Sequence, residues 1–155
     1  MDAVTQVPPP VNEVVRDYAP GSPERADLES ALTRLGGEQV DLLMTVGGVK
    51  RRGGGAAIEV VQPHARASVL GTAYDSTVDD AHAAIAAARD AAPMWRELSY
   101  DDRAAIFLKA AALLAGPWRS TLNAATMLGQ SKTAYQAEID AACELIDFWR
   151  FNVHF

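Results

Sequence analysis

Three carboxylates near the end of the sequence have a spacing that could serve chemistry. Asp140, Glu144 and Asp147 follow one another at intervals of four and three residues, so they share one face if the segment is helical. A carboxylate beside aromatic and aliphatic groups could bind the cationic part of a ligand, because a partly desolvated ion pair gives orientation as well as affinity. The alternative is a solvated acidic edge, and the spacing alone favours it.

Two more residues are of a reactive type. Cys143 is the single cysteine and lies inside the same predicted helix, with no base beside it, so we interpret it as a packed structural thiol rather than a nucleophile. His64 follows a proline and is interpreted as a turn residue. The three histidines are widely separated, and no Cys/His cluster has the spacing of metal ligands. The sequence therefore predicts no metal site.

The three acids lie in the second helix of a predicted helix-turn-helix over Ser120–Phe155. Gly129 is expected to end the first helix, because glycine readily adopts the left-handed conformation found there. Thr133 and Gln136 have the spacing of a capping box, which opens a helix that we expect to run to about Asn152. Two apolar rows at helical spacing predict packing of this helix against several neighbours. The rows are Ala134, Ala137, Ala141, Leu145 and Phe148, and Tyr135, Ile139, Ala142, Ile146 and Trp149.

The preceding segments predict a mainly helical chain with short antiparallel hairpin strands. Residues 1–21 contain three consecutive prolines and are expected to form an extended arm outside the core. A first helix is expected over Pro23–Leu35. The pair Gly47-Gly48 indicates a tight hairpin turn with positive φ at both positions. The triplet Gly53–Gly55 leads into another strand pattern at 56–61 rather than into a helix, so we interpret it as a turn and not as a phosphate-binding loop.

Two further helices are expected between the strands and the helix-turn-helix. Thr77 and Asp80 form a capping box that opens the first one, and Pro93 is expected to end it. Ser99 is expected to open the second helix, and Gly116 to end it. The inner face of the first of these helices is expected to carry Val78, Ala81, Ile85 and Ala88.

Composition excludes several classes of partner. The formal net charge of −6 and the pI near 5.0 argue against nucleic acid, whose phosphates need a basic surface. The sequence contains no run of 18 apolar residues, so it predicts no membrane span. The first twenty residues lack the basic and apolar regions of a signal peptide, so we expect a cytoplasmic location.

Longer stretches of the chain resemble the aldehyde dehydrogenase superfamily. The residues DDAHAAIAAARDAAPMWRELSYDDRAAIFLKAAALLAG are similar to its N-terminal region. The stretches VVQPH, DDRAAIFLKAA, TMLGQSKTAYQAEIDA and ELIDFWRFN resemble the branch that oxidises L-glutamate γ-semialdehyde, the open form of 1-pyrroline-5-carboxylate, to glutamate in proline catabolism. The resemblance covers about Tyr18–Phe155.

The resemblance implies an α/β aldehyde-dehydrogenase-like fold of which this chain is an N-terminal fragment. Residues 22–155 would form the first part of the dehydrogenase domain, without its Rossmann core and catalytic domain. The family's chemistry is attack of a thiolate on the aldehyde, hydride transfer to NAD and hydrolysis of the thioester. The nucleophilic cysteine, the glutamate base and the NAD segment are expected beyond residue 155. The sequence therefore predicts no catalytic and no cofactor-binding residue here, and an inactive isolated chain.

The resemblance also singles out Glu144 among the three acids. In the family this helix lines the substrate entrance, and Glu144 matches a glutamate placed to meet the amino group of the semialdehyde. Asp140 and Asp147 are left as solvated residues. A homo-oligomer or association with full-length subunits is expected, together with self-association of faces that the missing sheet would cover. Two alternatives are a non-catalytic interaction module derived from the enzyme and a fragment of a dehydrogenase for another aldehyde.

Overall fold

The computed structural model describes residues 6–155 as a chain of helices interrupted by short strands. This confirms the predicted mainly helical architecture with hairpin strands. The elements, in order, are α1 (Pro23–Gly37), β1 (Val40–Asp41), β2 (Met44–Val46), β3 (Val49–Arg51), β4 (Ala57–Gln62), β5 (Ala65–Tyr74), α2 (Val78–Glu97), α3 (Tyr100–Ala115), α4 (Arg119–Gln130), α5 (Ala134–Ala137), the π-helical turn η1 (Glu138–Cys143) and α6 (Glu144–Asn152).

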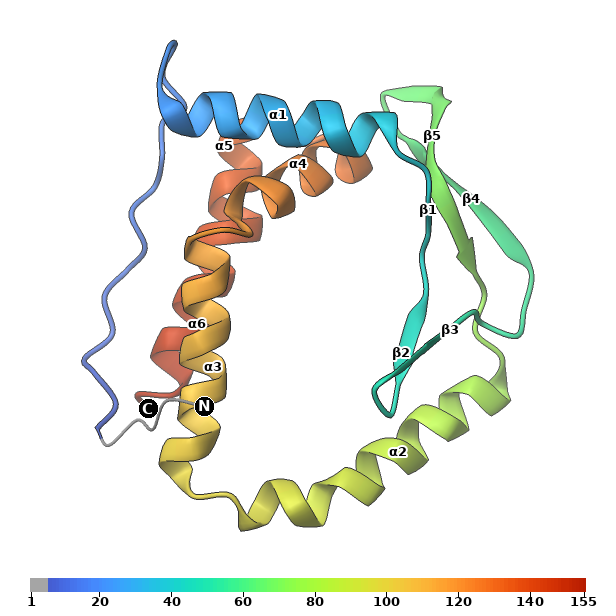
Figure 1. Ribbon diagram of the computed structural model, residues 1–155, viewed down its shortest axis with the longest axis vertical. Coiled ribbons are helices and arrows are strands. Elements are labelled where there is room, and N and C mark those ends of the chain that lie inside the picture. Colours follow the sequence, from blue (N-terminus) through green and yellow to red (C-terminus); the bar gives the residue numbers. More distant parts are fainter. Residues whose placement is uncertain (1–5) are drawn as a thin grey trace.

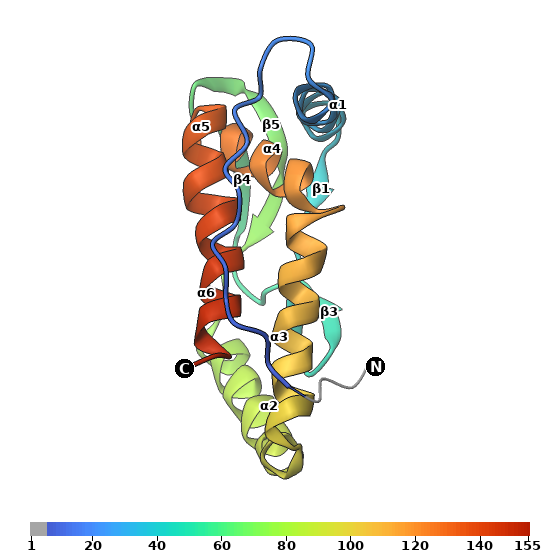
Figure 2. The same ribbon diagram turned by 90° about the vertical axis from the view of Figure 1, so that its left-hand side faces the viewer.

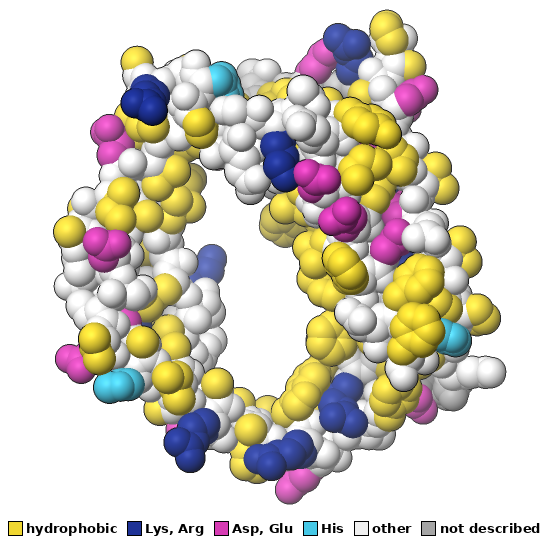
Figure 3. All heavy atoms as spheres, turned by 180° about the vertical axis from the view of Figure 1, so that it is seen from behind, with side chains coloured by type: hydrophobic (Ala, Val, Ile, Leu, Met, Phe, Trp, Pro, Cys, Tyr) yellow, Lys and Arg dark blue, Asp and Glu magenta, His cyan; other side chains and the backbone are white. Residues whose placement is uncertain are grey.

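The elements are arranged as a ring around an open centre (Figure 1). Helices α3 and α6 form one side of the ring, the strands form the opposite side, and α1 and α2 connect the two sides. The space-filling view shows that the opening is not filled by side chains and that hydrophobic groups lie along much of its rim (Figure 3). Packing therefore occurs within the walls of the ring and not at its centre.

The strands form two small sheets. Strands β2 and β3 pair as a hairpin whose turn residues Gly47 and Gly48 have φ values of 57° and 81°, which confirms the predicted turn. Strands β4 and β5 form the second hairpin. In addition, β1 pairs in parallel with β5, with Val40 opposite Gly71. A Cβ at Gly71 would overlap the carbonyl oxygen of Val40, so this position needs glycine for the backbones to approach. The hairpin patterns in the sequence did not predict this parallel pair.

Helix α2 departs from the prediction in two respects. Its capping box between Thr77 and Asp80 is present, but the helix continues through Pro93 to Glu97. Proline removes one backbone donor, and the loss is tolerated here because Pro93 lies on an exposed part of the helix. The predicted inner face is also wrong, since Val78 is 71% exposed and Ile85 is 55% exposed. Asp80 is the buried residue of this helix, and all four residues of the predicted inner face are exposed.

The helix-turn-helix forms with a small change at its turn. The Thr133–Gln136 capping box is present in both directions, and the helical segment that follows ends at Asn152, as predicted. However, α4 ends at Gln130, and the left-handed residue is Ser131, with φ 58°, rather than Gly129. The hydroxyl of Ser131 lies 2.7 Å from Nδ1 of His64 in the β4–β5 turn, so a tertiary contact holds the non-glycine residue in this conformation. His64 is a turn residue, as expected.

Two hydrophobic clusters stabilise the ring wall. Tyr18, Leu28, Ala31 and Ala124 form one, and Ala111, Leu114, Ala142 and Ile146 form the other. Tyr18 belongs to the proline-containing arm, so the prediction that this segment lies outside the core is wrong at that residue. Figure 2 shows why: the arm runs lengthwise over the helices, beside α6, before it turns into α1. The predicted division of the chain at residue 21 stays a prediction.

The exposed apolar face of α2 leads to a testable expectation about self-association. Within residues 6–155, no helix has both the length and the apolar character needed to cross a membrane. We expect the purified chain to self-associate, because Val78 and Ile85 lie seven residues apart on one helix face and both contact solvent. The double variant Val78→Glu, Ile85→Glu should shift the mass measured by multi-angle light scattering toward the monomer.

The matched control for this prediction adds the same charge at the same spacing but removes much less apolar surface, because alanine has only a methyl group. Ala84→Glu with Ala91→Glu replaces two exposed alanines of α2 and should leave the mass distribution close to that of the original chain. A monomeric original chain, or equal effects of the two double variants, would contradict the expectation.

Candidate functional site

The π-turn η1 lies directly before Glu144. It closes i→i+5 backbone hydrogen bonds, including one from the amide of Glu144 to the carbonyl of Ile139. Such a turn takes up about one residue more than an α-helical turn, and π-turns are frequent at functional sites. The buried face consequently changes from one predicted apolar row to the other. Ala137 is buried directly before the turn, Ala142 is buried within it, and Ile146 is buried after it.

One end of each predicted row is exposed. Phe148 at the end of the first row and Tyr135 at the start of the second contact solvent, whereas Ala134 and Trp149 are half-buried. The prediction of two continuous rows is therefore wrong, because the π-turn interrupts an α-helical register that the sequence pattern assumes throughout.

The carboxylates of Asp140, Glu144 and Asp147 have different surroundings. Glu144 is exposed, and its carboxylate forms no hydrogen bond or ion pair with another residue of the described chain, 6–155. Asp140 accepts a hydrogen bond from Nζ of Lys132 at 2.7 Å on the surface, where such a pair contributes little to stability. Asp147 binds the arm, accepting from Nδ2 of Asn12 at 2.8 Å and from the amide of Glu13 at 2.7 Å. The expectation that Asp147 is merely solvated is therefore wrong.

A buried ionic cluster lies behind the π-turn. Glu138, its first residue, is fully buried, and both of its carboxylate oxygens accept hydrogen bonds. Oε2 accepts from the Tyr18 hydroxyl at 2.7 Å, from Nδ2 of Asn123 at 2.7 Å and from Nε of Arg119 at 3.2 Å. Oε1 accepts from the amide of Arg16 at 2.8 Å and from Nη2 of Arg119. The carboxylate thus connects α4, the π-turn and the arm at one point.

Arg119 extends the cluster to a second carboxylate of the arm. Its Nη1 pairs with Oε1 of Glu13 at 2.5 Å, and its Nη2 donates to the carbonyl of Val14 at 2.6 Å. Glu13 also pairs with Arg150 of α6 at 2.7 Å. The arm is therefore bound through charged side chains and through its own backbone. Because the partners are more than 100 residues apart, this attachment depends on the tertiary fold.

The cluster shifts the pKa values of the groups in it. Burial would raise the pKa of Glu138, but hydrogen bonds from Arg119 and Tyr18 outweigh this effect and lower it to about 2. Burial, followed by the neighbouring Glu138, raises the pKa of Tyr18 to about 12. At neutral pH the cluster therefore contains an ionised Glu138 and a protonated Tyr18 hydroxyl that donates to it.

Cys143 is the structural thiol that the sequence predicted. It is buried at the last position of the π-turn and forms no disulfide. Burial, followed by the negative charge of Glu138, raises its pKa to about 11. Because the thiolate is the nucleophilic form of cysteine, this environment makes Cys143 unreactive at neutral pH.

Sequence reasoning missed the cluster, although two patterns point to it. Arg119, Asn123 and Thr126 are spaced by four and three residues, so they form one polar helix face, and all three are buried. Glu138 lies four residues after Ala134 and four before Ala142, within the apolar side of its helix. A charged residue at such a position needs a buried partner of opposite charge. Neither pattern identifies that partner without the structure.

The glycine triplet does not fit the pyrophosphate of a dinucleotide. The amide of Gly54 donates to Oδ2 of Asp80 at 2.8 Å, so the carboxylate of the chain itself occupies the anion position beside the N-terminus of α2. A Cβ at Gly53 would overlap the carbonyl of Asp75, which shows that backbone already fills the space beside this glycine. The triplet is a turn, as predicted, and we assign it no role in cofactor binding.

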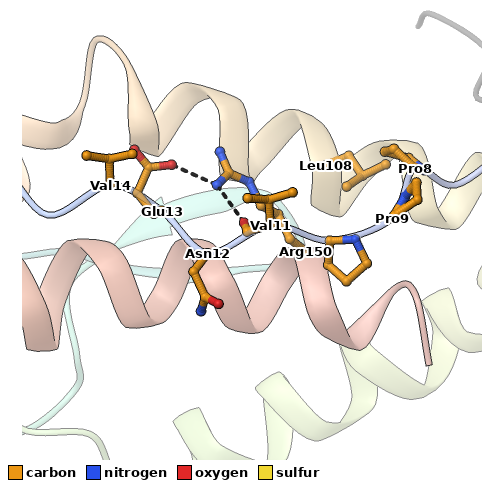
Figure 4. Close-up of a pocket in the computed structure, with 9 residues that line it drawn as sticks. Pro8, Pro9, Val11, Asn12, Glu13, Val14, Leu108 and Arg150 are labelled. Atoms are coloured by element: carbon orange, nitrogen blue, oxygen red, sulfur yellow. Dashed lines mark hydrogen bonds and ion pairs between the residues drawn. The ribbon is translucent and has the colours of Figure 1, made fainter.

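A hollow of about 370 Å³ lies beside the arm (Figure 4). Residues 8–14 line it together with Leu108 and Arg150. Figure 4 shows Arg150 between Glu13 and the backbone of Val11, and its charge is paired with Glu13. The hollow therefore offers a ligand no unpaired charge among its described residues. No group of three or more potential metal ligands occurs within residues 6–155 either.

The comparison with known proteins identifies the fold. The model of the aldehyde dehydrogenase family matches residues 49–154, which is more than half of the chain. The chain belongs to the aldehyde dehydrogenase family. It is 42% identical over 154 residues to the Delta-1-pyrroline-5-carboxylate dehydrogenase of Agaricus bisporus, covering 99% of this chain and 28% of the relative. The human mitochondrial Delta-1-pyrroline-5-carboxylate dehydrogenase is 41% identical over 145 residues, covering 93% and 25%.

A solved structure of the same kind of enzyme agrees with this aldehyde dehydrogenase assignment. The Delta-pyrroline-5-carboxylate dehydrogenase of Mycobacterium tuberculosis, bound with NAD, superposes with a TM-score of 0.94 at 59% identity. The superposition covers 99% of this chain and 29% of that one. The resemblance and the fold expected from the sequence are thus confirmed, and the chain spans less than a third of the length of each of these relatives.

The environment of Cys143 in this family member predicts slow alkylation. At pH 8 the folded chain should react with iodoacetamide at least about tenfold more slowly than the urea-unfolded chain, because burial blocks access and the raised pKa reduces the thiolate fraction. Mass spectrometry of timed samples measures both rates. Equal rates under conditions where circular dichroism shows a folded chain would contradict a buried thiol.

The lowered pKa of Glu138 predicts a pH-dependent contribution to stability. A carboxylate whose pKa is depressed on folding stabilises the protein above its unfolded pKa of 4.5, and this contribution is lost as the pH falls toward the folded value of about 2. Glu138→Gln should lower the free energy of unfolding at pH 7 by about 3–5 kcal/mol, because the charge of Arg119 loses its buried partner. Urea unfolding monitored by circular dichroism measures this difference.

The sign of the effect is tested by repeating the unfolding at lower pH. The difference between the original chain and Glu138→Gln should shrink between pH 4.5 and 2, since protonation removes the same charge. Glu29→Gln is the matched control, because Glu29 pairs with Arg25 on the exposed surface of α1 and should change stability little. A difference that is independent of pH would show that Glu138 does not act through its charge.

Proposed function

We propose that this chain forms the N-terminal part of an NAD-dependent dehydrogenase that oxidises L-glutamate γ-semialdehyde, the open form of 1-pyrroline-5-carboxylate, to glutamate in proline catabolism. The observation that carries the proposal is the likeness to the M. tuberculosis enzyme, with 59% identity and a TM-score of 0.94 over 99% of this chain. The names of the fungal and human relatives support the same substrate.

In this proposal Glu144 binds the amino group of the semialdehyde. The substrate carries an ammonium group at neutral pH, whereas a simple aldehyde of similar size does not. An exposed carboxylate without a partner in the described chain can accept charge-assisted hydrogen bonds from that group. Because simple aldehydes lack this contact, Glu144 would contribute to specificity rather than to the reaction of the aldehyde carbon.

The described residues supply binding and orientation, and we assign the reacting groups to other parts of the enzyme. Cys143 is excluded as the nucleophile by its burial and its raised pKa. NAD would accept the hydride in the complete enzyme, and we assign none of residues 6–155 to hold it. The isolated chain is therefore expected to be inactive.

We infer association of this chain with further copies or with full-length subunits, and the exposed Val78 and Ile85 of α2 support such contacts. The cytoplasmic location stays a prediction, because the names of the human and Dictyostelium discoideum relatives include the word mitochondrial.

A chimera tests the function directly. Residues 1–155 would replace the matching part of the M. tuberculosis enzyme, which supplies the remaining length. The chimera should form NADH from the semialdehyde, and residues 1–155 alone should not. In the chimera, Glu144→Gln should raise the KM for the semialdehyde about tenfold, the loss expected for one hydrogen bond between charged groups, and should leave the KM for propanal unchanged.

The control for this experiment is Asp140→Asn, the same change at a neighbouring exposed acid that pairs with Lys132. It should not alter the ratio of the two substrates. Equal losses for both aldehydes in the Glu144 variant would remove the assigned contact. A soluble chimera that oxidises propanal but not the semialdehyde would contradict the proposed substrate.

A further inference from the structure

We propose that the N-terminal arm and the buried pair Arg119–Glu138 hold the π-turn that directs Glu144 to the surface, so that residues of the arm act as positioning residues for the substrate contact. This inference rests on the proposed role of Glu144. Its structural part depends only on the chain itself, on the register of the helix and on the contacts of the cluster.

The register of the helix shows what the π-turn does for Glu144. An α-helix advances by about 100° per residue, so residues seven apart face nearly the same direction. Glu144 lies seven residues after Ala137, which is fully buried. In an uninterrupted α-helix Glu144 would therefore face the interior with Ala137. The observed π-turn takes up about one extra residue, and Glu144 is exposed instead, while Ile146 is fully buried.

The guanidinium of Arg119 joins the two ends of the π-turn. Its Nη2 donates to Oε1 of Glu138, the first residue of the turn, and lies 3.4 Å from Sγ of Cys143, the last residue. Residues five apart in an α-helix point about 140° away from each other, so one guanidinium could not reach both. The two contacts are compatible with the wider π geometry. Arg119 therefore stabilises the π form against the α form.

The arm completes the cluster from its other side. The carbonyl of Val14 accepts from Nη2 of Arg119 at 2.6 Å, and the amide of Arg16 donates to Glu138 at 2.8 Å. The carboxylate of Glu13 forms an ion pair with Nη1 of Arg119 at 2.5 Å. Without these groups of the arm, the guanidinium of Arg119 and the carboxylate of Glu138 would lose hydrogen-bond partners that water cannot replace.

The arm is also attached on both sides of the π-turn along the helix. Tyr18 is in the core and binds Glu138 at the beginning of the turn. Asn12 and Glu13 bind Asp147, one helical turn after Glu144. The arm thus spans the segment that carries Glu144 while leaving the Glu144 side chain free. A change in the arm can therefore reach the substrate contact through the register of this helix.

The experiment uses the chimera and a double-mutant cycle between Glu13→Gln and Glu144→Gln. Glu13→Gln removes the charge that pairs with Arg119 and keeps the shape of the side chain. It should lower the ratio of kcat/KM for the semialdehyde to kcat/KM for propanal about fivefold, a size typical of coupling through a packed network. In the Glu144→Gln background, Glu13→Gln should not change that ratio further, because the contact through which it acts is gone.

A second variant and a second measurement protect the test against simple unfolding. Tyr18→Phe removes one hydrogen bond to Glu138 and keeps the aromatic ring in the core, and it should act in the same direction as Glu13→Gln. Hydrogen exchange should be faster at the amides of 139–144 in both variants and unchanged in α1. Glu29→Gln, which breaks the exposed pair with Arg25, is the matched control and should alter neither measurement.

The outcomes separate this inference from the proposed function. If Glu144→Gln lowers the substrate ratio but Glu13→Gln lowers it equally in both backgrounds, the arm does not act through Glu144 and the inference is wrong. Unchanged exchange at 139–144 in the arm variants would overturn it as well. If Glu144→Gln leaves the ratio unchanged, the proposed contact itself is wrong, and the positioning role is lost with it.

Discussion

The carboxylate of Glu138 is the interaction on which the rest of this structure depends. It is fully buried and accepts hydrogen bonds from Arg16 and Tyr18 of the arm and from Arg119 and Asn123 of α4. A buried charge is tolerated only when opposite charge and hydrogen bonds replace its hydration, so each of these elements must be in place for the others to fit. Residues near both ends of the described chain are thereby held together by one side chain.

The value of such a cluster lies in specificity more than in net stability. A buried ion pair loses much of its attraction to the cost of removing both charges from water. It does, however, penalise every arrangement that leaves one charge unpaired. Here the penalised alternative is an uninterrupted α-helix, because Glu138 and Cys143 could not then face Arg119 together. The cluster accordingly selects the π-turn and with it the outward direction of Glu144.

Helix α2, in another part of the ring, is held by fewer contacts than the helices around Glu138. Helix α2 is attached mainly at its N-terminus, where Asp80 accepts hydrogen bonds from Thr77 and Gly54 and pairs with Arg51 at 2.9 Å. Val78 and Ile85 on its apolar face are exposed, and near its C-terminal end Trp95 packs edge-on against Phe107 of α3. The chain spans less than a third of the M. tuberculosis enzyme that it resembles. Its wall of α3 and α6 is well packed, whereas α2 is packed poorly.

Local chemistry in the sequence by itself determined the family, the capping boxes at Thr77 and Thr133, the Gly47-Gly48 turn and the structural character of Cys143. These features depend on neighbouring residues or on long stretches of similarity. Only the tertiary structure decided the parallel pairing of β1, the exposed face of α2, the docking of the arm and the π-turn before Glu144. Each of these depends on groups that meet from distant parts of the chain. A helical pattern can show that Glu144 shares a face with other acids, but the partners of Glu138 and Arg119 decide which way that face points.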